Sequence, residues 1–378
     1  MTVGSVKQPD DLGARSPRVS VVLPVYNSEP FLADAVNSIL EQTYRDFELI
    51  AIDGGSVDAS GGILDRFAIT DNRMTVLHQP NAGMLADLNR GLELARGEFV
   101  ARMDADDVAH PERFARQVAF LDAHPDIAVV GCAVTLIDES GARIRDVEYP
   151  LTPAAAAAFL EKGSPLAHPS VMMRRAAVLG VGAYRPAFRY AEDYDLWVRI
   201  AERYQIANLP DRLLFYRQHQ TKQSFIHAVE TRFATRIAWF AARCRRAGKP
   251  DPIEGMIGFA PQDIDRFDLS SRERANIQFE LVEALLEVDP AMAKPDAARK
   301  ALELFALADI GAADGTRLVR TMLMLAQGFA RRGQPLIAVR WLWRAVTCRR
   351  NGFVDVFGVA LGWARRRLVR RGRAARMG

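Results

Sequence analysis

Three carboxylates follow an apolar stretch in the segment GEFVARMDADDVAHPERF, residues 97–114. Asp104, Asp106 and Asp107 lie within four positions, directly after residues 98–103, which are typical of a buried strand. Carboxylate oxygens suit Mg²⁺ or Mn²⁺, and such ions bind through one or two carboxylates together with substrate phosphates. The Asp-x-Asp of Asp104 and Asp106 could therefore hold a divalent cation. The alternative is a polar loop whose Asp residues cap the next helix, and an isolated Asp-x-Asp favours that alternative.

A second acidic pair, Glu192 and Asp193, opens the segment YAEDYDLWVRIAERY, residues 190–204. The spacing of its apolar residues predicts a helix. Acidic residues are common at helix N-termini because the helix dipole stabilises them there, so a structural role is the simpler interpretation. A carboxylate at this place could also take a proton from an attacking hydroxyl group.

The elements that would position these carboxylates alternate between strands and helices. The predicted strands are residues 19–26, 47–53, 74–78 and 98–103, and the predicted helices are 28–43, 84–96 and one that begins near Pro111. This alternation predicts a mostly parallel sheet with helices on both faces. Ligands of such sheets bind beyond the carboxyl ends of the strands, which is where Asp53 and Asp104 fall.

Two other classes of nucleotide site are disfavoured. The turn after the first strand, NSEP, has no Gly-x-Gly-x-x-Gly, and the glycines at 54, 55, 61 and 62 have the wrong spacing for a Rossmann-type oxidoreductase. A nucleotidyltransferase lacks support as well, because no Gly-rich loop with a lysine follows the first strand.

Composition and charge point to a globular protein that does not bind nucleic acid. The 378 residues are 49% hydrophobic and 25% charged, enough for two domains with a sizeable core. Cys132, Cys244 and Cys348 are scattered and form no zinc or disulfide pattern, so we expect a cytoplasmic protein. The net charge of +4 depends on residues 365–378, which hold seven Arg and no acid. Without them the chain would be net negative, which argues against a nucleic-acid-binding surface.

Several segments occur together in an order that resembles the family 2 glycosyltransferases, inverting enzymes that use nucleotide-diphosphate sugars. The matching segments are residues 19–60, 81–107, 168–175 and 191–203. The resemblance extends over roughly residues 18–220, a little over half of the chain. It implies the glycosyltransferase A fold, in which a nucleotide-binding sheet flanked by helices is joined to an acceptor-binding half.

The resemblance also implies roles for the residues that match family motifs. Asp104 and Asp106 match the metal-binding DXD motif, with Asp106 as the direct ligand, and His219 matches a histidine that can reach the metal or the diphosphate. Asp53 matches the first acid of an Asp-Asp-Gly-Ser turn that approaches the nucleotide. Gly54 stands where the second acid often contacts the base, so the nucleobase does not follow from the resemblance. The other residues that match donor-side segments are Pro24, Tyr26, Asn27, Gly83 and Asn89.

Glu192 and Asp193 match the motif whose Asp is the general base, which makes Asp193 the expected catalytic residue and Glu192 a supporting one. His168 matches a family signature and could either shape the acceptor side or satisfy a turn. The positions of Arg217 and Lys222 favour solvated charges over phosphate contacts.

The final third of the chain is predicted to be helical, with a basic tail. Residues 353–368 combine apolar positions on one face with arginines, a pattern typical of a helix that lies on an anionic membrane surface. A core helix with a solvated tail is the alternative. We expect a lead at 1–17, a catalytic domain at 18–225, a helical accessory region at 226–350 and a basic amphipathic tail at 351–378.

These observations predict a metal-dependent, hexosyltransferase-like glycosyltransferase that needs Mg²⁺ or Mn²⁺. Its donor would be a nucleotide sugar, UDP-sugar being the family's commonest choice. Its acceptor would be a glycan or a lipid-linked hydroxyl group, met at the inner face of the membrane during bacterial polysaccharide assembly. The alternative is a catalytically inactive, transferase-like binding or scaffold protein, which the intact Asp104, Asp106 and Asp193 disfavour.

Overall fold

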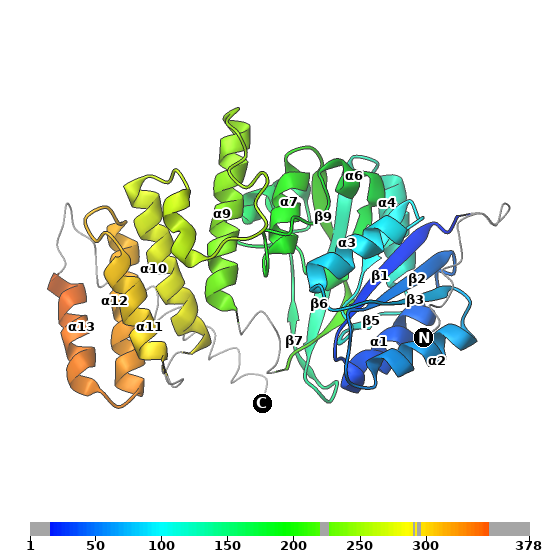
Figure 1. The fold of residues 1–378 in the computed structure, drawn as a ribbon, viewed down its shortest axis with the longest axis horizontal. Helices are drawn as coiled ribbons and strands as arrows, with labels where there is room; N and C mark the ends of the chain where they lie inside the picture. Colours follow the sequence, from blue (N-terminus) through cyan, green and yellow to red (C-terminus); the bar gives the residue numbers. More distant parts are fainter. Residues whose placement is uncertain (1–15, 220–226, 290–291, 293–295, 348–378) are drawn as a thin grey trace. The chain divides into compact units, whose positions relative to one another are not determined.

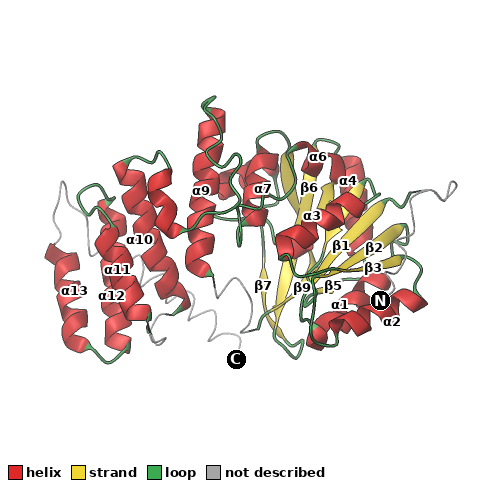
Figure 2. Cartoon of the chain, in the orientation of Figure 1, coloured by secondary structure: helices red, strands yellow, loops and turns green. Residues whose placement is uncertain are grey.

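The chain divides into two compact units, Met1–Gln220 and Thr221–Gly378, seen in the computed structural model of Figure 1. The described residues are 16–219, 227–289, 292 and 296–347. Residues 1–15 of the predicted lead and the whole predicted tail, 351–378, lie outside them. Figure 2 shows that strands occur in the first unit, whereas the second is helical.

The first unit is built on a sheet to which the described residues contribute nine strands. The strand order is β3-β2-β1-β4-β8-β6-β9-β5, and β7 pairs with β6 outside this path. The strands are β1 (Val19–Val25), β2 (Phe47–Asp53), β3 (Met74–His78), β4 (Phe99–Arg102), β5 (Val108–Ala109), β6 (Ile127–Ile137), β7 (Arg143–Val147), β8 (Met172–Arg174) and β9 (Gln205–Arg217).

The predicted parallel strands form one half of this sheet. β3, β2, β1 and β4 pair in parallel, and their carboxyl ends share one edge. The other half is mixed, because β8 is antiparallel to both β4 and β6, whereas β9 is parallel to β6 and antiparallel to β5. The α/β class expected from the sequence is confirmed, and the antiparallel strands begin beyond β4.

Helices cover both faces of the sheet. α1, α2 and α4 bury Leu32, Leu64 and Phe114 in a core with alternate residues of β1, β2 and β4. α3 packs on the opposite side of β1, where Gly91 lies so close that a Cβ atom would stand 2.3 Å from Val22. The helices are α1 (Glu29–Leu40), α2 (Ser60–Thr70), α3 (Met84–Leu94), α4 (Arg113–Ala123), α5 (Pro153–Leu160), α6 (Arg175–Gly180), α7 (Glu192–Ala201) and the 3₁₀ turn η1 (His168–Ser170).

The second unit is a set of helices around its own apolar core. Phe279, Phe305 and Trp341 lie in that core, with the Phe305 ring 5.1 Å from Phe279 and 4.8 Å from Trp341. Within the described ranges, no helix is long and apolar enough to cross a membrane. The elements are α9 (Ala228–Arg246), η2 (Pro261–Arg266), α10 (Ser271–Val288), α11 (Ala297–Leu307), α12 (Gly315–Arg331) and α13 (Pro335–Thr347).

Candidate active site

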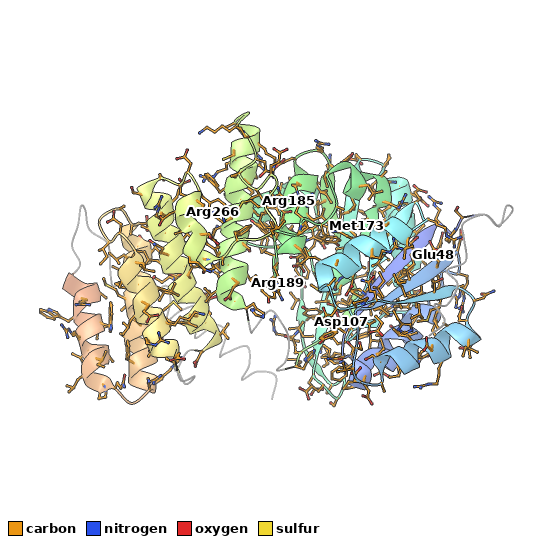
Figure 3. The ribbon with its side chains drawn as sticks, viewed as in Figure 1. Glu48, Asp107, Met173, Arg185, Arg189 and Arg266 are labelled. Carbon is orange, nitrogen blue, oxygen red and sulfur yellow. The ribbon has the colours of Figure 1, made fainter. Side chains whose placement is uncertain are left out.

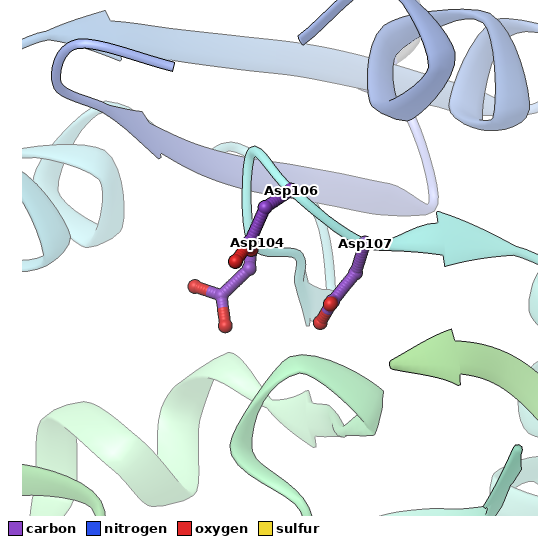
Figure 4. Close-up of side chains that lie close together, drawn as sticks. All are labelled: Asp104, Asp106 and Asp107. Carbon is purple, nitrogen blue, oxygen red and sulfur yellow. The ribbon is translucent and has the colours of Figure 1, made fainter. Parts of the chain in front are cut away.

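Three carboxylates gather in the turn between β4 and β5. Asp104, Asp106 and Asp107 each offer an oxygen, and these oxygens lie within 4.8 Å of one another. Figure 4 shows the three side chains projecting to the same side of the turn. α4 begins later, at Arg113, with Glu112 as its N-cap residue, so the three acids do not cap that helix. Asp107 is fully buried and accepts a hydrogen bond from the Arg217 backbone, whereas Asp104 and Asp106 are partly exposed.

A buried arginine lies beneath these carboxylates. Arg102 ends β4, is 3% exposed and pairs with Asp104 at 2.5 Å. Among the residues that the structure describes, its Nε and Nη1 atoms are buried and have no hydrogen-bond partner. Burial disfavours the charged guanidinium, but the attraction of Asp104 and the hydrogen bond to it prevail and raise the pKa of Arg102. The site therefore contains a permanent positive charge at its base.

The end of β9 brings a histidine to the same turn. His219 Nε2 lies 2.7 Å from Asp106 Oδ2, and its ring stands 5.6 Å from that of Phe31. Arg217 is 3% exposed, and its guanidinium donates to the Asp106 carbonyl at 2.8 Å. Arg217 thus fixes the turn from the buried side and is not the solvated charge that the sequence favoured.

A second pair of carboxyl groups opens α7. Glu192 is 5% exposed, and Asp193 is half-buried with its Oδ1 accepting from the Tyr194 amide at 2.7 Å. Burial raises the pKa of both groups, and the neighbouring Asp193 raises that of Glu192 further. Arg102 acts in the opposite direction on both. The two acidic clusters therefore share Arg102 as a common positive charge.

The start of α7 is held by a buried ion-pair network. Asp195 is fully buried and accepts from Arg199 Nε at 2.9 Å and from Arg185 Nε at 3.0 Å. Arg185 lies in the segment before the helix (Figure 3). Tyr190, two residues before Glu192, has a positive φ of 70°, which is uncommon outside glycine. These features fix the direction in which the first turn presents its carboxyl groups.

On the donor side, Asp53 is bound by the protein itself. Its Oδ1 accepts from the Ser56 amide at 2.9 Å, and its Oδ2 lies 2.9 Å from His78 Nδ1. Burial favours a higher pKa for Asp53, but the hydrogen bonds from Ser56 and His78 outweigh it and lower the pKa. Asp53 thus remains charged and holds the turn after β2, and its approach to a nucleotide stays a prediction.

The remaining donor-side residues lie at the carboxyl ends of β1 and β3. Pro24 is within β1, and Tyr26, just after it, is 52% exposed. Asn27 accepts a hydrogen bond from the Val57 amide at 2.9 Å. Gly83 precedes α3 with a φ of 88°, and a Cβ atom there would have no neighbour within 4 Å among the described residues.

Two polar residues serve the structure of the loop before α7. Asn89 of α3 makes a reciprocal pair with the Tyr184 backbone, donating at 2.8 Å and accepting at 3.0 Å. His168 is buried, and its Nε2 lies 2.8 Å from the Tyr184 hydroxyl. Burial and the nearby Arg102 lower the pKa of His168 well below its usual value, so it is neutral. Its contacts fit an internal packing role.

The structure thus brings Asp104, Asp106 and His219 together and links them through Arg102 to the pair at the start of α7. Asp53 belongs to the end of β2, two strands away from β4. Lys222 lies outside the described residues. Sequence reasoning missed Arg102, although a charge inside an apolar strand was a usable signal. It also missed the buried Asp195, whose partners only the fold identifies.

Comparisons with known proteins agree with this architecture. The sequence model of "Glycosyl transferase family 2" matches residues 20–181, a range that contains Asp104 and Asp106 but ends before α7. The amylovoran biosynthesis glycosyltransferase AmsE of Erwinia amylovora is 34% identical over 52% of this chain and 74% of its own length. The O-antigen biosynthesis glycosyltransferase WbnJ of Escherichia coli is 32% identical over 53% of this chain and 80% of its own.

Among solved structures, this chain resembles S. aureus TarS 1-349, crystallised in complex with UDP-GlcNAc. The TM-score is 0.54 at 19% identity, over 90% of this chain and 95% of that one. Because the identity is low, this likeness concerns the fold, and it confirms the predicted glycosyltransferase A type.

Proposed function

The chain belongs to glycosyl transferase family 2 and is a glycosyltransferase, and we propose that it transfers a sugar from a nucleotide-diphosphate sugar with inversion at the anomeric carbon. The acceptor hydroxyl group loses its proton to Asp193 while its oxygen bonds to the anomeric carbon. The bond from that carbon to the diphosphate breaks in the same step, and a nucleoside diphosphate leaves. Asp193 is the proposed base, and Glu192 supports the acceptor side.

The observation that carries this proposal is the pairing of two acidic clusters around one buried arginine. Asp104 and Asp106 supply oxygens for the diphosphate side, and Asp193 supplies the proton acceptor. Arg102 influences both clusters, which requires the two to be near each other. A proton acceptor close to a leaving-group site is what a single displacement needs.

The residues present fit a hard divalent cation. Partly exposed carboxylates of Asp104 and Asp106 and the imidazole of His219 are donors that Mg²⁺ or Mn²⁺ accepts. Asp107 lies in the same cluster but is fixed to the Arg217 backbone, so it supports the turn. We assign Asp106 as the direct ligand, with Asp104 and His219 beside it. A cation bound there would neutralise charge on the leaving diphosphate.

The acceptor side rests on the relatives. Two of them are named for amylovoran and O-antigen biosynthesis, so we propose that this chain also adds a sugar to a bacterial surface glycan, either free or lipid-linked. Transfer would take place at the inner face of the membrane. Pro24, Tyr26, Asn27, Asp53 and Gly83 are the proposed donor-binding residues.

Calorimetry with UDP, GDP, TDP and CDP, with and without Mn²⁺, tests the proposal. We expect one nucleotide to bind in a Mn²⁺-dependent manner and Asp106→Ala to lose that dependence. Asp126→Ala removes an exposed acid elsewhere in the same unit and should bind like the wild type. If the folded wild type binds none of the nucleotides, the catalytic assignment is wrong and a binding or scaffold role takes its place.

A further inference from the structure

A buried carboxylate outside both acidic clusters lies at the edge where β2 and β3 end. Asp87 is the fourth residue of α3 and is 3% exposed. Within the part of the chain that the structure describes, its one hydrogen-bond donor is Gln79, whose Nε2 reaches Asp87 Oδ1 at 2.6 Å. Burial raises the pKa of Asp87, and the nearby Asp53 raises it further. A carboxylate can accept about four hydrogen bonds, so Asp87 has acceptor capacity beyond the bond from Gln79.

Asp87 occupies the space that a side chain at position 54 would need. A Cβ atom built on Gly54 would stand 2.6 Å from Asp87 Oδ2 and 3.4 Å from its Cγ. Non-bonded heavy atoms do not approach to 2.6 Å without a shift, and Gln79 holds the Asp87 carboxylate in place. Asp87 can therefore occupy this space only because residue 54 is a glycine. As a result, α3 supplies the carboxylate at the end of β2.

The distance from Asp87 to the turn that holds Asp104 and Asp106 suits a nucleotide with its base at one and its diphosphate at the other. β2 and β4 are separated by β1, and adjacent strands are about 4.8 Å apart, so the ends of β2 and β4 are roughly 10 Å apart. With the diphosphate at Asp104 and Asp106, as in the proposed function on which this inference rests, the base would fall beside Asp87 and Gln79.

The pair offers an acceptor next to a donor. Asp87 Oδ2 can accept an N–H, and Gln79 Nε2 has a second hydrogen beyond the one given to Asp87. Uracil and thymine at N3–H, and guanine at N1–H, each present a donor beside a carbonyl oxygen. Cytosine and adenine instead have a bare ring nitrogen at that place, whose lone pair would face the carboxylate.

We propose that Asp87, together with Gln79, recognises the lactam edge of the donor's nucleobase and rejects cytosine and adenine. Asp87 is thereby a specificity-determining residue that the motifs of the chain do not identify. A lost hydrogen bond to a charged group lowers affinity about 10- to 100-fold, which sets the expected effect.

Calorimetry on the full chain with Mn²⁺ tests this with UDP, GDP and CDP. We expect the wild type to bind UDP or GDP at least about 10-fold more tightly than CDP, and the preferred one of the two identifies the lactam base. In Asp87→Asn, the amide can donate to the cytosine ring nitrogen, so the preference should shrink or reverse. Asp126→Asn, an exposed acid in the same unit, should leave the preference unchanged.

A double variant supplies the carboxylate from position 54, directly after β2, instead of from α3. Gly54→Asp combined with Asp87→Ala should recover part of the preference that Asp87→Ala alone loses, because the acid returns to the same space. A wild type that binds CDP as tightly as UDP and GDP overturns the inference without any variant, and so does an Asp87→Asn protein that weakens all three equally. If the wild type binds no nucleotide at all, the proposed function fails and this inference fails with it, whereas the first two results leave that function standing.

Discussion

Glu192 and Asp193 have one catalytic task between them, and their surroundings decide which performs it. Burial raises the pKa of both groups, that of Glu192 to about 8, and Asp193 is the more exposed of the two, so we expect Glu192 to hold the proton and Asp193 to act as the base. We expect Asp193→Asn to reduce kcat by at least about 100-fold while nucleotide affinity is kept, because a general base supplies about 10²–10⁴. Glu192→Gln should retain most of the activity, since the amide resembles a neutral carboxyl group. Steady-state kinetics with the same donor on both variants distinguish the two roles. A larger loss of kcat in Glu192→Gln than in Asp193→Asn would make Glu192 the base.

The raised pKa of Asp193 has a consequence for pH dependence. The base must be ionised, so kcat falls as the pH drops through its pKa. Because burial raises that pKa, the acid limb should lie above the value of about 3.9 for a solvated Asp. Arg102 lowers the pKa, so Arg102→Gln should move the limb to higher pH. A kcat–pH profile with an acid limb at or below pH 4 would contradict this arrangement.

Arg102 also matters for stability. Its side chain is 4% exposed in an ion pair with Asp104 and influences Glu192 and Asp193. Removing one partner of a buried pair leaves uncompensated charge, so Arg102→Met should lower the free energy of unfolding by about 3–5 kcal/mol. Arg116→Met provides the matched control, because the pairs of Arg116 with Glu112 and Asp211 are exposed and should contribute little to stability. Urea unfolding near pH 7 measures both; equal losses would refute the role of Arg102.

At the scale of single residues, the sequence identified those that belong to recurring motifs. Asp104, Asp106 and Asp193 could be singled out because acids at the ends of strands and helices stand out from their neighbours. Asp87 could not, since it is one acid among many on helices. Arg102 stands out as a charge within an apolar run, but nothing in the sequence indicates its partners. Their importance depends on burial and on side chains distant in sequence, which only the folded chain brings near.

Among the elements, α7 depends most on buried charge for its position. Asp195 stands between Arg185 and Arg199, and all three come from the segment that presents the proposed base. Asp195→Asn should cost about 3–5 kcal/mol of stability, because the buried Arg199 and the partly buried Arg185 lose their counter-charge. It should also reduce kcat more than it changes KM, since Asp193 is displaced while the donor-side residues are not. Glu112→Gln, at an exposed pair, is the control for urea unfolding and kinetics. Unchanged kcat in Asp195→Asn would show that the network does not position the base.

The sequence predicted strand bounds accurately where a strand shows as a continuous apolar run between turns. β2 and β3 have the predicted bounds, and β1 is one residue shorter than predicted. α1 and α7 are shorter at both ends than expected. Ser28 is the N-cap residue of α1, but its hydroxyl donates to the Tyr26 carbonyl and makes no cap hydrogen bond to the helix. The β6–β9 pairing was not predicted, because it joins residues 77–80 positions apart and contains register irregularities, and apolar patterns do not encode a partner.

At the scale of the whole molecule, the second unit bears on the fold and the basic tail on the proposed binding to a membrane. The elements of the second unit that the structure describes are helices, as predicted for the final third of the chain, and α10 covers Ser271–Val288. The tail at 351–378, with its seven arginines at 365–376, lies outside the described residues, so its role is argued from charge alone. Its proposed partner is an anionic lipid surface, on which a lipid-linked acceptor would be presented.

Vesicle co-sedimentation tests that partner. Each Lys or Arg near an anionic membrane contributes about 1 kcal/mol, so seven arginines can provide substantial affinity that weakens as salt screens the charges. We expect the full chain to bind vesicles that contain phosphatidylserine but not purely zwitterionic vesicles, and to be released at about 1 M salt.

Replacing the seven arginines with glutamine should abolish binding while kcat on a soluble acceptor stays unchanged, because the proposed catalytic residues all lie in the first unit. A permutation of residues 365–378 that keeps all seven arginines is the control. Arginines of α9 and α12 are unsuitable as controls, because Arg236 and Arg317 pair with the buried Glu280 and Glu283. Equal vesicle binding by the full chain and the glutamine variant would contradict a membrane role for the tail.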